Sequence, residues 1–594
     1  MNNMSESINM SRQQYIEWIP QIIYNHHQSG PAGTVVAGPP YRDPFNHVFD
    51  PLLTTSLDGV GAAMINRLHQ EDRPGYTRLG GSVFSSWWNG GLRTTPYYQY
   101  NRDFDRNYRQ SYTFLCAFER LIPNNANPYP ITPQEWKFKN SIDYSVSLNY
   151  AILNHAVRHG DELLYNIYLM VEIRSNEEKK ILGRCIPKMP KQSKMLSKLL
   201  KRKQSKKMKM LFSTGIEQVY QLSFMILCTK IHPKEIHVAT SCRLIKQISL
   251  QRSIFECVDQ IRNFGKSYPA GSYIVKTAQA FRPHVIDMFE PQDHPNDFLY
   301  PGGPPIRPYD AAGWTLAYQM GVEVDRIMEG FDGPFVRVPY GEIQSPPSFN
   351  LANSSGYLLD ARSNNVFMVV NELLQAKINV FRTSSDQKGL PMGSFYVSNA
   401  GKKILEKAAK EYGVKPVAIS GQPAGSKEIK PARIGLFDLY GGSMPSGWVR
   451  WMMEQFQFPY QLVFTKEIDG GQLNEKFDVL VFIGPGIPPA GSAGGITRSQ
   501  PKAEEIDPAY HHMLGSISKS ASIPQLKSFL QSGGKIITVG AATSLAYHLD
   551  LPVSNALVEM GSEGKEKALT GEKYYIPGSV LECLWTILIL QTME

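Results

Sequence analysis

The sequence predicts an α/β protein on two observations. In residues 431–556, short apolar runs that indicate buried strands alternate with stretches of helical spacing, which is typical of a parallel sheet flanked by helices. Residues 12–98 also alternate short apolar runs with Gly/Pro-rich loops and one helical stretch. The 594 residues, 42% of them apolar, allow roughly three to four domains of about 150 residues each.

Two helices are expected in the first 170 residues. Helical spacing of apolar residues predicts the first over 60–68, with Asp58 as its N-cap, and the second over 145–169. Apolar positions of the second recur at three and four residues: Val146, Tyr150, Leu153, Ala156 and Val157.

Residues 265–430 are expected to form a strand-rich α+β region without a catalytic role. Apolar runs predict strands over 357–360 and 366–370, and helical spacing predicts helices over 316–329 and 402–412.

The C-terminal domain is expected to be a doubly wound parallel sheet over residues 431–556, followed by a tail over 557–594. Its predicted strands are 432–438, 460–464, 477–483 and 533–540, and its predicted helices are 448–456 and 523–532. This order resembles class I glutamine amidotransferase-like domains, which are flavodoxin-like. In that family a cysteine nucleophile sits at a strand-to-helix elbow, but residues 540–545 hold no cysteine. A scaffold or interaction role is therefore favoured over catalysis.

Charge and cysteine are concentrated in three stretches that do not match their surroundings, at about 99–118, 171–264 and from about 582. Residues 171–264 hold 20 Lys and Arg against 7 Asp and Glu, a charge of +13 in a chain of net charge +9, so the remainder carries −4. The six cysteines lie in or at the edge of these stretches: Cys116, Cys185, Cys228, Cys242, Cys257 and Cys583. They include no C-x-x-C pair that would predict a structural zinc knuckle or a disulfide framework.

A changed reading frame is one hypothesis for these stretches. Residues 100–112 can be encoded so that a one-base shift gives an apolar, strand-like peptide with a single Glu, and the tail can hide a polar loop in the same way. The alternative is that degenerate codons permit many such shifted peptides. Residues 171–264 are accordingly expected to be disordered or out of frame. The lysine-rich part, 188–209, could instead be a nucleic-acid arm, but it has no interleaved aromatic residues, so no nucleic-acid partner is predicted.

The segment 21–36 indicates a candidate metal ligand. A short apolar run ends on His26 and His27, and a Gly/Pro-rich loop follows at once, which is how a strand delivers an imidazole to a cleft. Together with Trp87-Trp88-Asn-Gly-Gly at 87–91, the segment resembles the second half of a carboxypeptidase A-type zinc metallopeptidase domain, in the large bacterial group of that family.

The resemblance implies one zinc ion with His27 as its third ligand, because His27-Gln-Ser-Gly fits the family's step better than His26 does. The family's other two ligands, a His-x-x-Glu pair, should precede this segment, and residues 1–25 contain no His. This predicts an N-terminally truncated domain over residues 1–170. The place of the family's general-base Glu holds Arg106-Asn107, so no catalytic residue can be assigned. A lone imidazole binds zinc weakly.

For the other candidate residues, a structural role is favoured over a chemical one. Asp43, His47 and Asp50 are expected to be turn residues near His27. Trp87 and Trp88 could line a substrate pocket or be buried in the core. The pair His511-His512 should be solvated, and Gly484-Pro-Gly486 lacks the Lys and Ser/Thr of a phosphate loop.

By resemblance, the function is zinc-dependent hydrolysis of C-terminal peptide bonds in the periplasm or outside the cell, impaired or lost in this chain. The partner would be a peptide or protein substrate. The sequence contains neither a signal peptide nor an apolar run of the roughly 20 residues that a membrane anchor needs. The alternative is a non-catalytic peptide- or protein-binding protein built on the peptidase scaffold.

Resequencing the DNA tests the frame hypothesis. Compensating insertions or deletions are expected around the codons for 99–118 and 171–264 and near codon 582. A single unbroken frame through all three stretches would end the hypothesis. An in-frame His-x-x-Glu upstream of Met1 would restore the missing ligand pair.

Overall fold

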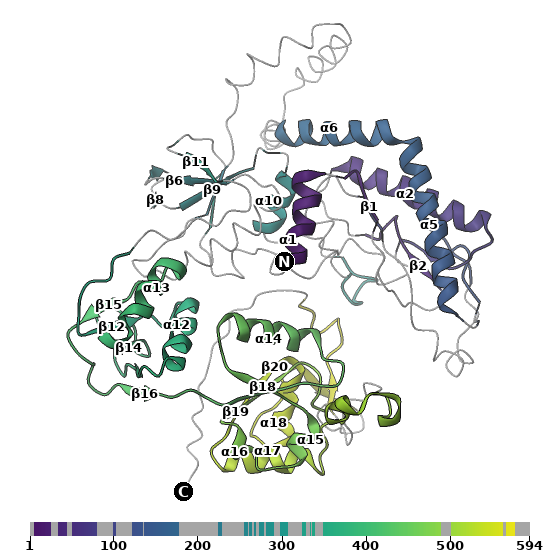
Figure 1. Ribbon diagram of the computed structural model, residues 1–594. Coiled ribbons are helices and arrows are strands. Elements are labelled where there is room, and N and C mark those ends of the chain that lie inside the picture. The colour runs from purple at the N-terminus through teal and green to yellow at the C-terminus, as the bar shows by residue number, and fades with distance from the viewer. Residues whose placement is uncertain are drawn as a thin grey trace. The chain divides into compact units, whose positions relative to one another are not determined.

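The chain divides into two compact units in the computed structural model. One comprises Met1–Lys230, Thr240–Gln344 and Leu569–Glu594, and the other Ile231–Ala239 and Ser345–Ala568 (Figure 1). The structure describes the following residues: 5–18, 20–24, 34–43, 50–79, 99–101, 122–132, 134, 136–176, 224–227, 255–258, 261–263, 266–268, 272–277, 279, 281–289, 297–306, 324–327, 333, 335–338, 349–488, 500–561 and 566–576.

Two long helices organise the N-terminal part of the first unit. Helix α2 (Pro51–Gln70) packs against α5 (Phe138–Arg158), and α6 (Gly160–Asn176) continues from α5 after a break at His159 (Figure 1). Their shared core includes Met64, Leu68, Tyr144 and Leu148. None of the helices in the described part of the chain, the 21-residue α5 included, is long and apolar enough to cross a membrane.

Two expectations for these helices are wrong in detail. Asp58 lies inside α2, and the N-cap is Asp50, whose carboxylate accepts a hydrogen bond from the backbone N–H of Leu52 at 2.9 Å. The expected helix 145–169 is two helices, because Gly160 follows a non-helical His159. Helical periodicity alone does not show such a one-residue break.

Short strands complete this part of the unit. Strand β1 (Ile22–Tyr24) pairs in parallel with β4 (Gln99–Asn101), and β2 (Val36–Ala37) pairs in parallel with β3 (Tyr76–Thr77). Helix α1 (Ser5–Arg12) and the single π turn η1 (Gln13–Glu17) precede them.

The first unit also contains an antiparallel sheet of order β10-β5-β9-β6-β11. Its strands are β5 (Phe224–Leu227), β6 (Phe255–Val258), β9 (Ser272–Lys276), β10 (Asp325–Ile327) and β11 (Phe335–Val338). Helix α10 (Arg282–Phe289) follows β9, and β7 (Ile261–Asn263) pairs with β8 (Lys266–Tyr268). The predicted helix at 316–329 is wrong where the structure describes it, because Asp325–Ile327 forms strand β10.

The second unit begins with a β-α-β-β-α-β segment in a sheet of order β15-β12-β14-β13-β16. Each neighbouring pair is antiparallel, so each helix connects two strands that run in the same direction with a third strand between them, the split β-α-β arrangement. The elements are β12 (Gly356–Leu359), α12 (Asn364–Gln375), β13 (Val380–Arg382), β14 (Phe395–Ser398), α13 (Lys402–Tyr412), β15 (Val417–Ile419) and β16 (Lys427–Ile429).

Residues 366–370, expected to be a strand, lie in α12. Val366, Val369, Val370 and Leu373 recur at three and four residues and are buried together against the sheet. The β-branched run suggested a strand, but tertiary packing of this helical stripe outweighs the small intrinsic penalty of valine in a helix.

The second half of this unit is a parallel four-stranded sheet of order β18-β17-β19-β20. Its strands β17 (Ile434–Phe437), β18 (Tyr460–Val463), β19 (Val479–Ile483) and β20 (Lys535–Val539) fall within the four predicted strands. The helices are α14 (Met444–Gln455), α15 (Thr465–Asp469), α16 (Leu473–Lys476), α17 (Ser522–Gln531) and α18 (Leu545–His548). Helices and strands in mixed sheets confirm the α/β class. A small hairpin, β21 (Val558–Met560) with β22 (Glu566–Ala568), follows.

The two faces of the parallel sheet are covered unequally (Figure 1). One face carries the larger core, in which Leu480 and Phe482 pack with Leu526 and Phe529 of α17. On the other face α14 packs through Val449 and Met453 against Leu436, Val481 and Ile483.

Two side-chain amides join the halves of this unit. Asn371 Nδ2 of α12 donates to the carbonyl oxygen of Phe456 at 2.9 Å, and Gln375 Nε2 donates to that of Gln457 at 3.1 Å. Both acceptors lie just beyond the C-terminus of α14, where helix carbonyls lack intrahelical partners.

Replacing Leu526 by Ala should lower the free energy of unfolding by about 2–5 kcal/mol, because its side chain is fully buried at the centre of the larger core and its loss leaves a cavity. Urea unfolding of the full chain measures the change. The matched control is Leu551→Ala at an exposed leucine, which should stay within about 0.5 kcal/mol of the parent. Equal effects of the two substitutions would contradict the assigned core.

Candidate functional site

The residue with the strongest sequence-based assignment, His27, lies outside the described residues, as do His26, His47, Trp87, Trp88, Arg106 and Asn107. The structure does describe the strand that leads to His27. Strand β1 ends at Tyr24, and its parallel partner β4 ends at Asn101, which is the register partner of Tyr24. The segments that contain His27 and Arg106 therefore follow, in sequence, the same ends of two neighbouring parallel strands.

Asp50 and Asp43 have structural positions. The Asp50 carboxylate is buried and caps the first turn of α2. Asp43 is exposed, and its carbonyl oxygen accepts a hydrogen bond from Arg42 Nη1 at 2.8 Å. Asp50 therefore serves helix α2, in agreement with the structural role expected for it.

A catalytic zinc site needs three protein donors arranged around one ion. Among the residues that the structure describes, no group of three or more His, Cys, Asp or Glu side chains is placed to hold a metal. His27 is not among these residues, and no catalytic step is derived through zinc.

The C-terminal ends of the parallel strands form a second candidate site, because open parallel sheets bind ligands at this edge where neighbouring connections leave in opposite directions. That position lies between β17 and β19, since β17 continues toward β18 and β19 toward β20. Gly441 and Gly442 follow β17 with φ of 80° and 65°, and Gly484 and Gly486 follow β19 with φ of 67° and 142°. These turns need a left-handed backbone, which glycine adopts without steric cost.

The polar side chains of this edge hold its own backbone. The buried Asp438 carboxylate accepts hydrogen bonds from the backbone N–H of Leu439 at 2.8 Å and from Ser446 Oγ at 3.0 Å. Ser443 Oγ caps α14 by accepting from the backbone N–H of Ser446 at 3.2 Å. These groups shape the loop that starts α14, and their hydrogen-bonding capacity is already engaged there.

The elbow after β20 has the shape but not the chemistry of a nucleophile site. Gly540 has φ of 65° and begins a 3-10 turn, Gly540–Ser544, which leads into α18. Thr543 Oγ1 donates to the carbonyl of Gly540 at 2.8 Å, and Ser544 Oγ donates to that of Ala541 at 3.0 Å. His548 is buried, and its Nε2 lies 2.8 Å from the carbonyl oxygen of Pro488. Both hydroxyls and the imidazole thus bond to backbone carbonyls within this part of the chain.

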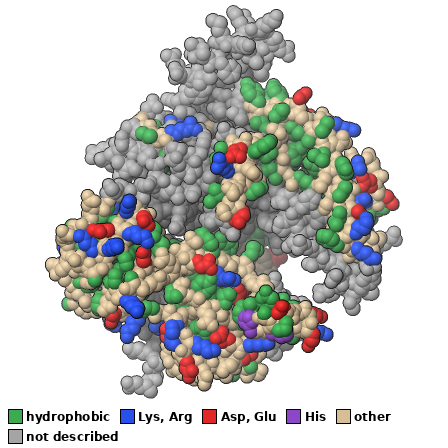
Figure 2. Space-filling model, in the orientation of Figure 1, with side chains coloured by type: hydrophobic (Ala, Val, Ile, Leu, Met, Phe, Trp, Pro, Cys, Tyr) green, Lys and Arg blue, Asp and Glu red, His purple; other side chains and the backbone are tan. Residues whose placement is uncertain are grey.

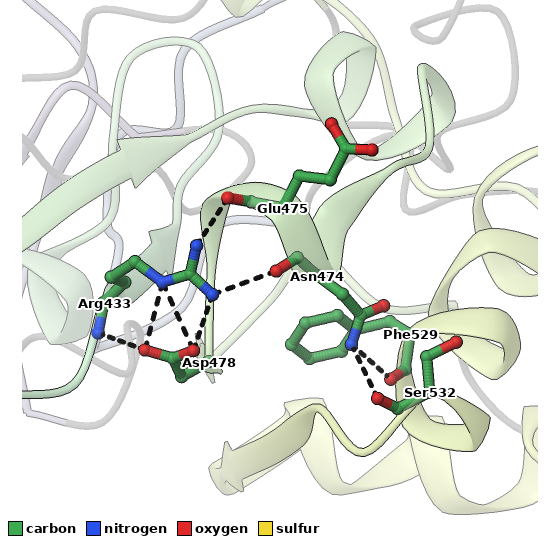
Figure 3. Close-up of polar contacts among 6 residues, drawn as sticks. All are labelled: Arg433, Asn474, Glu475, Asp478, Phe529 and Ser532. Atoms are coloured by element: carbon green, nitrogen blue, oxygen red, sulfur yellow. Dashed lines mark hydrogen bonds and ion pairs between the residues drawn. The ribbon is translucent and has the colours of Figure 1, made fainter. Parts of the chain in front are cut away.

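An ion pair with several further hydrogen bonds lies at the opposite edge, where β17 and β19 begin (Figure 3). The Arg433 guanidinium bonds Asp478 Oδ1 through Nη2 at 2.6 Å and the carbonyl of Asn474 at 2.9 Å, and it also reaches the carbonyl of Glu475. The backbone N–H of Arg433 donates to Asp478 Oδ2 at 2.8 Å. Asn474 Nδ2 extends the cluster to the carbonyl of Phe529 at 3.0 Å, at the end of α17.

This cluster, the Arg433 clamp, joins the starts of two strands to α16 and α17. Hydrogen bonds from the Arg433 side chain and backbone N–H, together with its positive charge, lower the pKa of Asp478 from 3.8 to about 2. Sequence reasoning missed it. Its only signal is that residues of opposite charge, Arg433 and Asp478, each stand second in a predicted strand, 432–438 and 477–483. Its hydrogen bonds tie the start of β17 to the start of β19 and to α16, which is a structural role.

A second charged cluster joins α2 to α5 around Glu71. Its carboxylate interacts with Arg67, with Arg73 Nε at 3.0 Å and with the hydroxyl of Ser147. Partial burial raises the pKa of Glu71, but the hydrogen bonds from Ser147 and Arg67 and the charges of Arg67 and Arg73 outweigh it and lower the pKa. Arg73 also lies over the ring of Tyr144, 5.3 Å from its centroid. These partners indicate a structural role.

Comparison with known proteins gives no match: no family model, no curated protein and no solved structure is similar to this chain.

Acid should weaken the second unit through the Arg433 clamp. The folded-state pKa of Asp478, about 2, lies below its ordinary value of 3.8, so its contribution is complete above pH 3.8 and is lost as the pH falls toward 2. Asp478→Asn should be less stable than the parent at neutral pH and should lose less stability over that acid range. Urea unfolding at a series of pH values measures both effects. The control Glu504→Gln, at an exposed carboxylate of the same unit, should have the same pH dependence of unfolding free energy as the parent. Identical pH profiles for Asp478→Asn and the parent would contradict the stabilising role of the clamp.

Proposed function

We propose that residues 1–170 are the C-terminal part of a carboxypeptidase A-type zinc metallopeptidase domain, with His27 as a zinc ligand. The observation that carries the proposal is the parallel pair β1–β4. The strand ahead of His27 and the strand ahead of Arg106-Asn107, where the family has its general base, end as register partners at Tyr24 and Asn101. Ligands and catalytic groups of α/β proteins gather at such an edge.

In this family, a bound zinc ion polarises the scissile carbonyl and activates a water molecule. The residues that the sequence supplies for this chemistry are one imidazole, His27, and no carboxylate at the general-base position. Peptide-bond hydrolysis at a substrate's C-terminus is therefore the reaction of the family, and this chain is expected to catalyse it poorly or not at all. By the same resemblance, the location is the periplasm or the cell exterior, and the partner is a peptide or protein.

For the C-terminal part we propose a flavodoxin-like domain of the class I glutamine amidotransferase-like type with a non-catalytic role. The parallel order β18-β17-β19-β20 supports it, since numbering the strands along this part of the chain gives 2-1-3-4. The elbow at Gly540 supports the loss of catalysis, because Ala541 and Ala542 follow the glycine and the neighbouring hydroxyls bond to backbone carbonyls.

A second candidate function is peptide or protein binding without catalysis, and the outer side of α5 favours it. Phe138, Tyr150, Leu153 and Val157 are exposed there, while Tyr144 and Leu148 of the same helix are buried against α2. A helix that is apolar on two sides is typical of an element packed between two partners. Hydrophobic side chains also gather over the neighbouring α6 (Figure 2), which includes the exposed Leu164, Tyr165 and Tyr168.

Zinc stoichiometry and peptidase activity of the purified full chain test the first proposal. Elemental analysis should find zinc well below one per chain, because a single imidazole holds the ion weakly. His27→Ala should reduce this zinc further, whereas His26→Ala, the adjacent matched control, should not. Blocked C-terminal peptides with added zinc should show little or no hydrolysis.

The outcomes separate the two candidates. Nearly one zinc per chain with chelator-sensitive hydrolysis would contradict the expected inactivity and support an intact enzyme. Zinc content that does not respond to His27→Ala would overturn the ligand assignment. Tight peptide binding that persists after zinc removal would favour the non-catalytic candidate.

A further inference from the structure

One face of the parallel sheet in the second unit is only partly covered among the described residues. Parallel sheets are typically buried on both faces. A helix is about 10 Å across and strands are about 4.8 Å apart, so one helix covers about two strands. Helix α14 is the helix that packs on this face among the described residues, and the sheet has four strands. The face therefore has room for a second helix.

The position of α14 shows which strand of this face is uncovered. At one edge of the helix, Glu454 Oε1 accepts a hydrogen bond from Tyr460 of β18 at 2.8 Å. At the other edge, Pro445 lies beside Gly484, the residue after β19: a Cβ at Gly484 would be 3.6 Å from the Pro445 ring. Helix α14 thus lies over β17 and its neighbours β18 and β19, and the uncovered strand on this face is β20.

The exposed face of β20 carries apolar side chains. Ile537 and Val539 of β20 are register partners of Val481 and Ile483, which α14 covers, yet they are 51% and 48% exposed. Ile536, on the opposite side of the strand, packs into the larger core. Strand β20 therefore has apolar side chains on both faces, which is typical of a strand that is covered on both faces.

The outer side of α14 is apolar as well. Met444, Trp448 and Met452 recur every four residues and are 47–83% exposed, while Val449 and Met453 face the sheet. Trp448 also stacks edge-on with Trp451, with ring centroids 6.0 Å apart. Met452 lies two turns after Pro445 on the same side of α14. The apolar stripe therefore lies on the side of α14 that is nearer to β20.

We propose that this face is a self-association surface, on which α14 of one copy lies over β20 of a second copy and the reverse contact forms at the same time. The outer side of α14 cannot reach the sheet of its own copy, because Val449 and Met453 already occupy that side of the helix. A twofold axis between the two α14 helices would bury the outer side of α14 and the exposed face of β20 in both copies at once. The result is a layer of two helices between two sheets.

The size of the surface fits this partner. Five large apolar side chains, about half or more exposed, present on the order of 400 Å² of apolar surface per copy. A standard-size interface buries about 800 Å² per partner, of which somewhat more than half is apolar. The surface of α14 and β20 therefore provides about the apolar content of one stable interface. The proposal is independent of zinc chemistry in residues 1–170.

Sedimentation velocity of the full chain over increasing concentration tests the proposal. A monomer–dimer equilibrium is expected. Trp448→Glu and Val539→Lys should each weaken dimerisation at least about tenfold, because each places a charge at the centre of the apolar contact. The matched control is Tyr510→Glu, at a half-exposed aromatic residue of the turn η6 (Pro508–Met513). Lys466 of α15 donates a hydrogen bond to the carbonyl of His511 in this turn, and α15 packs on the opposite face of the sheet.

Mixing the two charged variants tests the reciprocal arrangement. In a mixed dimer, Glu at 448 of one copy faces Lys at 539 of the other, and the second contact is the original Trp448 on Val539, so the mixture should dimerise better than either variant alone. Circular dichroism and thermal unfolding should show that both variants fold, and Met452→Glu with Ile537→Lys is the replacement pair if either does not. A full chain that stays monomeric at every concentration, a dimer that neither variant weakens, or a mixture without restored dimer would overturn the proposal.

Discussion

The requirement that a parallel sheet be apolar on both faces governs the second unit. Strands β17 and β19 satisfy it by placing alternate residues in two separate cores, with Leu480 and Phe482 on one face and Val481 and Ile483 on the other. The helices that cover these faces enter at the C-terminal ends of the strands, so their turns are made there with glycine in the left-handed region. The same requirement makes β20 informative, since its apolar Ile537 and Val539 are about half exposed beside the covered Val481 and Ile483 of β19.

Polar groups of this unit are used mainly to fix the connections of the sheet. Asp438 holds the turn into α14, and the Arg433 clamp ties the starts of β17 and β19 to α16 and α17. At the elbow after β20, Thr543 and Ser544 bond to backbone carbonyls. Catalysis needs groups that are free to exchange protons or attack a substrate. The polar groups named here serve the connections of the sheet, and the proposed peptidase ancestry depends on the first 170 residues.

The elements that sequence reasoning identified well are those with a strong local period. The four strands of the parallel sheet and the helix at 402–412 lie where apolar periodicity places them. Residues 366–370 were assigned to a strand because a valine-rich run is compatible with a strand or a helix. Only packing against the sheet selects the helix. Asp50 was overlooked as a cap because the helix begins with Pro51 and Leu52, ahead of the apolar period that marks its middle. The Arg433 clamp joins residues 45 positions apart, which no local pattern records.

The sequence by itself determined the α/β class and most of the local elements, because apolar periodicity is a local property of the chain. It also singled out His27 as the residue on which the peptidase proposal rests, from the apolar run and loop around it. Only the tertiary structure decided the strand order β18-β17-β19-β20, the pairing of β1 with β4 and the strand, β20, that α14 leaves exposed. These depend on contacts between residues far apart in sequence, whose energies add only once the chain has folded.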